Sequence, residues 1–538
     1  MSETDFIIVG AGSAGCAMAE RLSRNGRHTV TVLEAGGSDF RFFVKMPLGY
    51  GKTFYDPAVN WMYTTEPDEG LAGNSDYWPR GKLLGGSSSI NAMVWIRGAP
   101  RDYEDWKAAG NPGWGWDEML RAFREIEDYE GGADPWRGAG GPLHVSRIDK
   151  SVHPLTRTYL EACREAGLAS NDDFNGERQE GAGLYQLTTR NGRRFSAADA
   201  FLKPAMKRSN VRVITHAQVT RILFDGRRAI GVEFERNGKR ERLTCNREVI
   251  LSGGSVNTPQ LLQLSGIGDG ALLARLGIAV VLANSNVGRH LADHQGINYT
   301  WKANRPTLNQ LLRPWWGKLW AGMHYLMLRD GPLSISLNQG GGFFRTDPSL
   351  DEVNMQLYFQ AFSTVLPRPG ERPILTPDPW PGFSIGLSNC RTLSRGFIEA
   401  VSPDFRTKPK IVANAFSHER DVSEMLAAVK YLRHIAAQPA FREVIVEELL
   451  PGPSIASDED MILDFRKRSG TVFHPCSTCR MGADAAQNVV DGRLRVHGID
   501  RLRIADASIF PNITTGNTNA ASIATGWRGA EFILEDNQ

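Results

Sequence analysis

The sequence predicts an α/β protein of at least two domains, the first built on a parallel sheet. The chain has 538 residues, too many for one hydrophobic core, and 41% of them are apolar, as in a globular protein. Its first apolar run, Phe6 to Val9, leads directly into a glycine-rich turn and a helix-like segment. From about residue 298 the pattern changes to an apolar helical stripe followed by short strand-like runs.

The charge balance argues against nucleic acid as a partner. Lys and Arg total 62, Asp and Glu total 60, and the net charge is +2. No excess of positive charge is present to attract a polyanion. We therefore expect a small-molecule substrate.

The N-terminus predicts a cytoplasmic protein. Residues Met1 to Asp5 carry acids and lead directly into the first strand, without the basic and apolar regions of a signal peptide. No apolar run approaches the roughly 20 residues of a membrane-spanning helix. The six cysteines are scattered apart from Cys476 and Cys479, which is typical of reduced thiols in a cytosolic protein.

The first strand opens a dinucleotide-binding pattern. A glycine loop follows it, a helix is expected from Cys16 to Arg24, and a second strand from Thr29 to Leu33 ends on Glu34. The glycines permit a tight turn beside a pyrophosphate, and the acid holds a ribose hydroxyl, which favours FAD or NAD. The residues predicted to bind the cofactor here are Gly10, Gly12, Ser13, Ala14, Gly15, Glu34 and Ala35.

A second glycine- and serine-rich turn lies at Arg80 to Asn91. It follows an extended connection over residues 40–80 in which periodicity weakens. Its backbone N–H groups suit an electron-rich ligand, although an ordinary surface loop has the same composition.

The candidate catalytic residues lie near the C-terminus, in Phe473-His474-Pro475 and Gly516-Asn517-Thr518-Asn519. An imidazole can take the proton of an alcohol, and a neighbouring amide can hydrogen-bond the same oxygen as charge develops. Such a pair suits hydride removal from a carbinol carbon. The alternative is a core histidine beside two turn asparagines.

These motifs together resemble the glucose-methanol-choline (GMC) oxidoreductase family. The resemblance lies in Gly81 to Asn91, Gly254 to Gly268 and the His474 and Asn517 segments, and it extends from about Phe6 to Phe532. The chain is most similar to the choline dehydrogenase-like, bacterial alcohol and sorbose dehydrogenase branch. The resemblance implies a Rossmann-like FAD-binding domain and a discontinuous substrate domain built on an antiparallel sheet with helices. The expected boundaries are 1–150, 194–297 and 466–538 for the first domain, and 151–193 and 298–465 for the second.

The resemblance also implies FAD as cofactor, with its isoalloxazine between the second glycine loop and the His474/Asn517 wall. Members of the family with covalent flavin carry a His where this chain has Ile90, so we expect non-covalent FAD. The further cofactor-binding residues implied are Gly81, Leu84, Gly86, Ser87, Asn91, Ala92, Met93, Val94, Val219, Asp506, Ala507, Asn517, Thr518 and Asn519.

Several further elements are expected in the rest of the chain. The patterns predict helices within 103–130, 154–169 and 421–437, sheet strands at 211–214, 229–234, 248–251 and 502–504, and substrate-domain strands at 335–344, 355–359 and 397–400. Apolar residues at helical spacing over 308–327 predict a helix that Pro314 splits or kinks. We expect this helix to pack on its own domain; the alternative is an apolar entrance or a shallow membrane contact.

No metal site is expected. His290 and His294 have helical i, i+4 spacing but no third ligand, and Cys476-Ser477-Thr478-Cys479 lacks a second CxxC pair. We interpret these residues as structural.

The predicted reaction is FAD-dependent oxidation of a neutral primary alcohol to the aldehyde, with His474 as base and a quinone-type electron acceptor. In choline-oxidising relatives a glutamate faces the substrate cation, and alignment on Gly341-Gly342-Phe343 places Gln339 there, which cannot neutralise a cation. Gln339 and Phe473 are the predicted substrate contacts. The alternatives are an oxygen-using alcohol oxidase, a choline dehydrogenase, a flavin-containing cyanohydrin lyase, or a flavin-binding protein without enzymatic activity.

Overall fold

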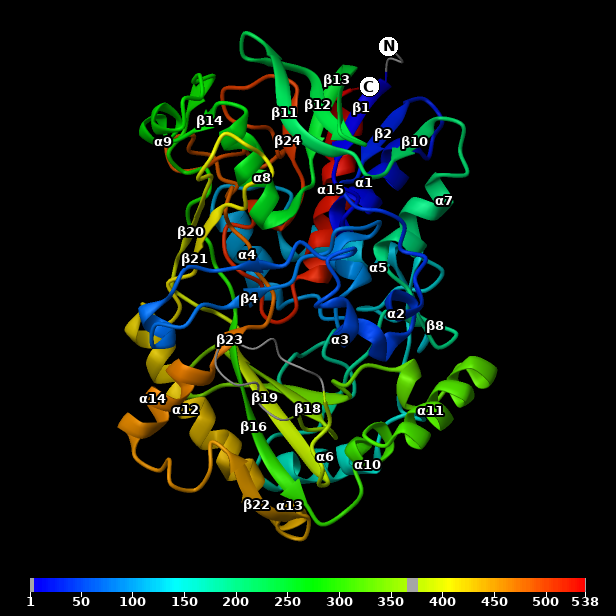
Figure 1. Cartoon of the computed structure of the whole chain (residues 1–538), viewed down its shortest axis with the longest axis vertical. Coiled ribbons are helices and arrows are strands. Elements are labelled where there is room, and N and C mark those ends of the chain that lie inside the picture. The colour runs from blue at the N-terminus through cyan, green and yellow to red at the C-terminus, as the bar shows by residue number, and fades with distance from the viewer. Residues whose placement is uncertain (1–3, 365–375, 538) are drawn as a thin grey trace.

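The computed structural model describes residues 4–364 and 376–537. Two sheets organise the chain, one in the upper and one in the lower part of Figure 1.

The first sheet has a parallel core of five strands. Their order is β10 (Val211–Ile214), β2 (Val30–Leu33), β1 (Thr4–Val9), β13 (Lys239–Leu251) and β24 (Leu502–Ile504). The first half of β13 forms an antiparallel ribbon with β12 (Arg228–Arg236) and β11 (Gln218–Asp225). This arrangement confirms the Rossmann-like fold predicted from the N-terminal pattern.

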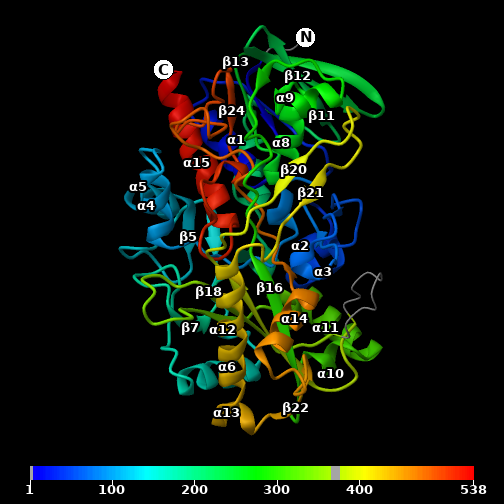
Figure 2. The same ribbon diagram turned by 90° about the vertical axis from the view of Figure 1, so that its left-hand side faces the viewer.

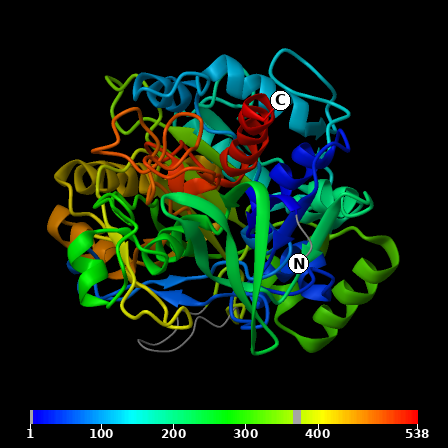
Figure 3. The same cartoon turned by 90° about the horizontal axis from the view of Figure 1, so that it is seen from above.

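Helices α1 (Ser13–Ser23) and α15 (Asn519–Asp536) lie side by side next to the parallel strands (Figures 1 and 3). A glycine makes their close approach feasible, because a Cβ on Gly526 would lie 2.2 Å from the carbonyl oxygen of Ala14. The two ends of the chain are therefore packed against each other in one domain.

The second sheet is antiparallel. Its order is β22 (Ile445–Leu450), β16 (Gln295–Ala303), β19 (Gly382–Asn389), β18 (Met355–Gln360), β17 (Gly340–Phe344) and β7 (Gly181–Leu184), and β23 (Gly470–Thr471) pairs with β16. Thus β16 begins inside the segment expected for the first domain, and so does β23. Helices α6 (Pro154–Glu165), α12 (Glu419–Ala436), α13 (Pro439–Arg442) and α14 (Asp458–Arg468) lie around it in Figure 2.

Strand periodicity gives the second sheet two chemically different faces. Along β16, Ile297, Tyr299 and Trp301 join the hydrophobic core beneath the helices, whereas Asn298 and Thr300 line a cavity. Successive strand side chains point to opposite faces, so one strand serves both packing and the cavity.

The remaining elements mostly match the expected positions. Helices α4 (Pro100–Ala108) and α5 (Trp116–Ile126) occupy the predicted 103–130 region, and residues 40–80 contain only short elements. These and the other short elements are α2 (Phe42–Lys45), α3 (Tyr50–Thr53), α7 (Lys203–Ala205), α8 (Gly254–Leu264), α9 (Gly270–Arg275), β3 (Tyr63–Thr64), β4 (Tyr77–Trp78), β5 (Glu127–Tyr129), β6 (Leu143–Val145), β8 (Thr189–Arg190), β9 (Arg193–Arg194), β14 (Ile267–Gly268) and β15 (Leu282–Ala283).

Two predictions about the second domain are wrong. The run 397–400 is not part of the large sheet, because β20 (Phe397–Glu399) pairs only with β21 (Lys410–Val412) in a separate ribbon. The apolar segment does split at Pro314 into α10 (Leu308–Leu312) and α11 (Trp315–Leu328), but α11 does not bury its large apolar side chains in its own domain. No helix among the described residues is long and apolar enough to cross a membrane.

Candidate active site

One cavity of about 1470 Å³ lies between the two sheets and is lined from both. It is larger than the roughly 300–1,000 Å³ of ordinary small-molecule pockets. The volume suits a dinucleotide together with a substrate.

Loops and helix N-termini of the first domain form the cofactor half of the cavity. Gly12 precedes α1 without a side-chain cap, so the first-turn N–H groups remain available to a phosphate. Ser13 donates to Asn519 at 2.7 Å, which ties this end of α1 to the start of α15. The N-terminus of α8 lines the same space through Gly254 and Ser255. Helix N-termini thus converge where an anionic cofactor is expected.

Two buried carboxylates hold these loops in place. Glu34 accepts hydrogen bonds from the backbone N–H groups of Ala11 and Gly36, at 2.9 and 2.8 Å. Burial raises the pKa of Glu34 to about 7. Asp506 accepts from the N–H of Gly254 at 2.8 Å and from the hydroxyl of Thr258 at 2.7 Å. Both residues line the cavity, where Glu34 offers an acceptor for ribose hydroxyls.

Glycines bring the two glycine loops together. A Cβ on Gly86 would lie only 2.8 Å from the Cα of Gly12, and Gly86 has a φ of +52°. A Cβ on Gly10 would lie 2.4 Å from the carbonyl oxygen of Ser252. A side chain at either position would push backbone against backbone and close the space for a cofactor.

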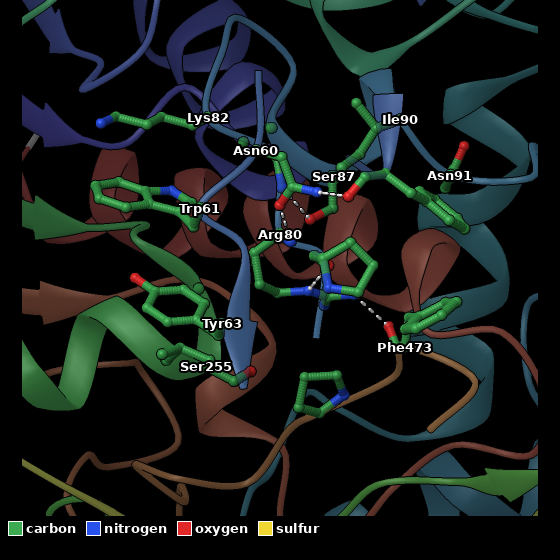
Figure 4. A pocket seen from close by; sticks show the side chains of 18 of the residues that line it. Asn60, Trp61, Tyr63, Arg80, Lys82, Ser87, Ile90, Asn91, Ser255 and Phe473 are labelled. Carbon is green, nitrogen blue, oxygen red and sulfur yellow. Dashed lines mark hydrogen bonds between the residues drawn. The ribbon is translucent and has the colours of Figure 1, made fainter. Parts of the chain in front are cut away.

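Cations and aromatic rings line the wall beside these loops (Figure 4). Lys82 lies over the ring of Trp61, with 4.5 Å from Nζ to the ring centroid. Arg80 donates to the carbonyl oxygen of Phe473 at 2.7 Å, and burial lowers its pKa to about 10, so it remains charged at neutral pH. Among the described residues, the lining contains the cations Arg80, Lys82, Arg406 and Lys408 but only the acids Glu34 and Asp506. This donor-rich chemistry fits FAD.

Most of the predicted cofactor residues line this cavity. They are Gly10, Gly12, Ser13, Ala14, Glu34, Ala35, Gly81, Gly86, Ser87, Asn91, Ala92, Met93, Val94, Val219, Asp506, Ala507, Asn517, Thr518 and Asn519. Gly15 and Leu84 are not among the described lining residues. Gly15 packs against Gly10, and the side chain of Leu84 belongs to the hydrophobic core. Ile90 lines the cavity, and among the described lining residues there is no Cys and no His other than His474.

The base predicted from sequence lies in this cavity beside the predicted amide. Nδ2 of Asn517 is 3.1 Å from Nε2 of His474, although 43 residues separate them. Phe473, immediately before the base, has a φ of +72°, an uncommon conformation outside glycine. Asp293 helps to fix the turn by accepting from the N–H of His474 at 2.9 Å and from the hydroxyl of Thr471.

A second histidine determines which nitrogen of His474 is protonated. His294 Nε2 is 3.0 Å from the carbonyl oxygen of Cys390, which only accepts, so this nitrogen carries the proton. Burial lowers the pKa of His294 to about 4, so the ring is neutral and its Nδ1 is an acceptor. His474 Nδ1 lies 3.0 Å from that nitrogen and therefore donates to it. Nε2 of His474 is left unprotonated, facing Asn517.

The amide orientation is fixed from the opposite side. Tyr358 donates to Oε1 of Gln356 at 2.6 Å, and Nε2 of Gln356 donates to Oδ1 of Asn517 at 3.2 Å. Asn517 must therefore present its N–H₂ group to His474. The chain of hydrogen bonds from Cys390 to Tyr358 has one consistent direction, and it presents a base nitrogen and an N–H donor side by side.

Burial, together with His294 and Arg80, holds the pKa of His474 well below its usual value. The imidazole is therefore neutral, and able to accept a proton, throughout the neutral pH range.

The predicted position of Gln339 in the substrate pocket is wrong. Its side chain is buried away from the cavity, where Oε1 accepts from the N–H of His153 at 2.7 Å and from the hydroxyl of Thr156 at 3.0 Å. Its neighbours Leu337 and Asn338 line the cavity instead. Phe473 does line it, as predicted.

Sequence reasoning missed the sheet residues that complete the substrate half. They are Asn298, Thr300, Tyr358, Gln360 and Ser384, from β16, β18 and β19. It also missed His294 and Gln356 as partners of the catalytic pair, having interpreted His294 only as structural. The sequence signal that could have pointed to His294 is its position directly after Asp293 and directly before β16.

Comparison with known proteins places this architecture in a family. The family model described as GMC oxidoreductase matches residues 4–296 in its N-terminal part and 392–526 in its C-terminal part. An oxygen-dependent choline dehydrogenase of Rhizobium johnstonii is 40% identical over 533 residues, which cover 99% of this chain and 96% of the relative. An alcohol dehydrogenase [acceptor] of Pseudomonas putida is 40% identical over 536 residues, covering 98% and 95% of the two chains.

Solved structures agree with the sequence comparisons. Pyridoxine 4-oxidase from Mesorbium loti aligns with a TM-score of 0.88 and 29% identity, over 98% of this chain and 99% of that one. A formate oxidase of Aspergillus oryzae aligns with a TM-score of 0.91 and 26% identity, over 99% and 98%. On its sequence, its two sheets and its cavity, the chain belongs to the GMC oxidoreductase family and is an FAD enzyme.

Proposed function

We propose that the protein oxidises a neutral primary alcohol to the aldehyde, with non-covalently bound FAD and with His474 as the base. The observation that carries the proposal is the directed hydrogen-bond chain that leaves Nε2 of His474 unprotonated, 3.1 Å from the amide nitrogen of Asn517. A hydroxyl oxygen that approaches both atoms from the cavity would donate its proton to Nε2 of His474 and accept a hydrogen bond from Nδ2 of Asn517.

Different residues bind the oxygen of that hydroxyl and accept its proton. His474 takes its proton at Nε2, and the resulting imidazolium keeps its Nδ1–H bond to His294. Asn517 holds the oxygen while negative charge develops on it, and Gln356 keeps the amide from rotating. The cofactor supplies two-electron acceptance, so that the alcohol leaves as an aldehyde.

The lining of the substrate half favours an uncharged substrate. Around Phe54, Leu337, Tyr358 and Phe362 the described residues provide aromatic, apolar, hydroxyl and amide groups but no carboxylate. A buried cation needs an acid to offset its desolvation. The preference for a neutral substrate therefore rests on these described lining residues and not on Gln339.

The choline dehydrogenase alternative has its own support. Relatives with that name are about as similar as the alcohol dehydrogenase, and aromatic faces such as those of Tyr50 and Phe54 can hold a quaternary ammonium group. We place choline second because the described residues of the substrate half offer it no carboxylate.

We further propose a quinone-type electron acceptor and a cytoplasmic enzyme that works at the membrane surface. The relative from Pseudomonas putida is named alcohol dehydrogenase [acceptor], which supports this choice, whereas the equally identical relative from Rhizobium johnstonii is named oxygen-dependent. If oxygen reoxidises the reduced enzyme faster than a quinone analogue does, the protein is an oxidase and the proposed acceptor is wrong.

The decisive experiment is anaerobic reduction of the bound flavin. The holoenzyme is mixed with choline or with its neutral carbon isostere, dimethylbutanol, and bleaching is followed by stopped flow. We expect faster bleaching and higher kcat/KM with the neutral alcohol. A clear preference for choline would assign the second candidate. Absence of bleaching by every alcohol, together with cleavage of a cyanohydrin, would indicate a lyase. Acid precipitation that leaves flavin on the protein would contradict non-covalent binding.

A further inference from the structure

Helix α11 turns its small residues inward and its large apolar residues outward. Gly317, Ala321 and Tyr325 are buried against the protein at i, i+4 spacing. The other face is 47% to 75% exposed and consists of Trp315, Trp316, Leu319, Trp320, Met323, Leu326, Met327 and Leu328. An ordinary surface helix has the reverse pattern. Contiguous exposed apolar side chains of this kind mark an interaction surface.

Aromatic residues beside α2 extend this surface. Phe40 is 84% exposed, and Phe42 and Phe43 are about half exposed. The ring of Phe42 lies 6.4 Å from that of Tyr325, which joins α2 to α11. We call the exposed apolar residues of α11 together with Phe40, Phe42 and Phe43 the apolar platform; α2 and α11 lie on the same side of the molecule in Figure 1.

The charged residues on the helical part of the apolar platform, from α10 to the end of α11, are all basic. Residues 308–329 contain no Asp or Glu, but they include Arg313, Lys318 and Arg329. Lys318 is exposed on the helix and forms no ion pair with the described residues. Of the acids next to the apolar platform in sequence, Asp330 contacts His324, and Asp39 pairs with Lys45 and Lys203. Such a surface attracts anions.

Helix α10, which leads directly into α11, borders the cavity. Leu308 and Leu312 of α10 pack in one hydrophobic cluster with Tyr50, Leu337 and Phe362, and these last three residues line the cavity. A surface seated on the apolar platform would therefore lie close to the substrate half.

We propose that the apolar platform docks the protein on anionic lipid membranes, with α11 lying in the plane of the interface. Tryptophan is favoured at the level of the headgroups, and Lys and Arg are attracted to anionic lipids. Fourteen residues of α11 span about 21 Å at 1.5 Å per residue, too little to cross a bilayer, so the helix lies flat. A second copy of the chain fits less well, because two faces with the same positive charge repel each other.

Vesicle binding of the FAD holoenzyme tests this proposal. Vesicles of phosphatidylcholine alone are compared with equimolar phosphatidylcholine and phosphatidylglycerol, and bound protein is measured by cosedimentation. We expect binding to the anionic vesicles. The variant Trp315→Ser/Trp316→Ser/Met327→Ser should weaken partitioning about tenfold or more, since it removes three interfacial apolar groups. Lys318→Glu should weaken it about fivefold on the anionic vesicles and little on the neutral ones.

A matched control separates docking from general surface polarity. Val280, Val401 and Val446 are each 51% to 54% exposed and lie outside the apolar platform, so Val280→Ser/Val401→Ser/Val446→Ser should bind like the wild type. Alcohol-driven reduction of a soluble dye should be unchanged in every one of these variants, because none of their residues lines the cavity.

Three results would overturn the proposal. One is a wild-type holoenzyme that binds neither kind of vesicle, and another is a platform variant that binds as well as the wild type. The third is a wild-type dimer in light scattering that the platform variant loses, which would assign the surface to a second copy. Flavin reduction in solution is measured separately, so failure of the proposed alcohol oxidation leaves the vesicle result interpretable.

Discussion

The two halves of the cavity are built by different means. The cofactor half consists of glycine turns and helix N-termini, where backbone groups face the ligand and a side chain would intrude. The substrate half consists of alternate side chains on one face of β16, β18 and β19, where the residue types decide the chemistry. Substitutions in the glycine turns of the cofactor half should therefore abolish cofactor binding, whereas residues of the substrate half can be substituted one at a time.

The largest effect should come from the base where the halves meet. His474→Ala should lower the anaerobic rate of flavin reduction by roughly 10²–10⁴-fold, the usual contribution of general-base catalysis. FAD content, read from the absorption spectrum, should be retained, because His474 is held by the turn at Asp293 and not by the glycine loops. A near-normal rate of flavin reduction in His474→Ala would contradict the role of His474 as the base.

Substitutions in the cofactor half should reduce FAD binding and not the rate of the chemical step. In Gly86→Ala the new Cβ would lie 2.8 Å from the Cα of Gly12, so we expect protein purified with little FAD. Gly132→Ala is the matched control, since Gly132 also has a positive φ, +90°, but has no atom within 4 Å of a Cβ. The comparison measures flavin per protein. Equal flavin content in both variants would contradict the close approach of the two loops.

A smaller loss should follow from removing the acceptor behind the base. His294→Ala leaves Nδ1–H of His474 without its partner, and we expect about tenfold slower flavin reduction, as for one buried hydrogen bond of about 1.5 kcal/mol. His294→Asn places an amide oxygen near the former Nδ1 and should restore much of the rate. If Asn is no better than Ala, His294 acts through packing alone.

Substitution of Gln356, the hydrogen-bond partner of Asn517, should have a smaller effect on the rate of flavin reduction. Glu in place of Gln356 cannot donate to Oδ1 of Asn517, so the amide can rotate and turn its oxygen toward His474. We expect Gln356→Glu to slow flavin reduction about fivefold, equivalent to about 1 kcal/mol, and Gln356→Leu to do the same. An unchanged rate in both variants would mean that other contacts orient Asn517.

The smallest effect should be that of pH. The neutral imidazole is the active form, and a pKa of His474 held well below 6.5 means that this form already predominates at neutral pH. Plotted against pH, kcat/KM for a neutral alcohol should be flat around neutrality and should fall only well below pH 6.5, as His474 becomes protonated. An acid limb centred at 6.5 or above would contradict the buried, neutral base.

The contrast between the cofactor half and the substrate half also explains which parts of the site can be predicted from sequence. The glycine loops were placed correctly because backbone requirements leave a spacing that can be recognised, from Gly10 to Glu34 and again around Gly86. Gln339 lies just before β17, in chain without strand alternation, so alignment on the following glycines could not predict that its side chain turns to His153 and Thr156. The role of His294 depends on contact with a residue 180 positions away, which no local pattern records.

Helix α11 shows a second limit of sequence reasoning. Its apolar residues at helical spacing predicted a buried face, but the small residues Gly317 and Ala321 allow the helix to approach the protein from the other side. Periodicity indicates that a helix has a distinct face, but it does not say what covers that face.

The position of β16 couples substrate choice to turnover. Its outward residues Asn298 and Thr300 line the cavity, while its first residues pair with β23, which leads two residues later into Phe473 and His474. Asn517 belongs to the other domain, just before α15. Anyone who remodels this strand to admit a bulkier alcohol also moves the anchor of the base relative to the amide. Specificity and speed in this enzyme are therefore not independent engineering variables, and selection for one should leave a trace in the other.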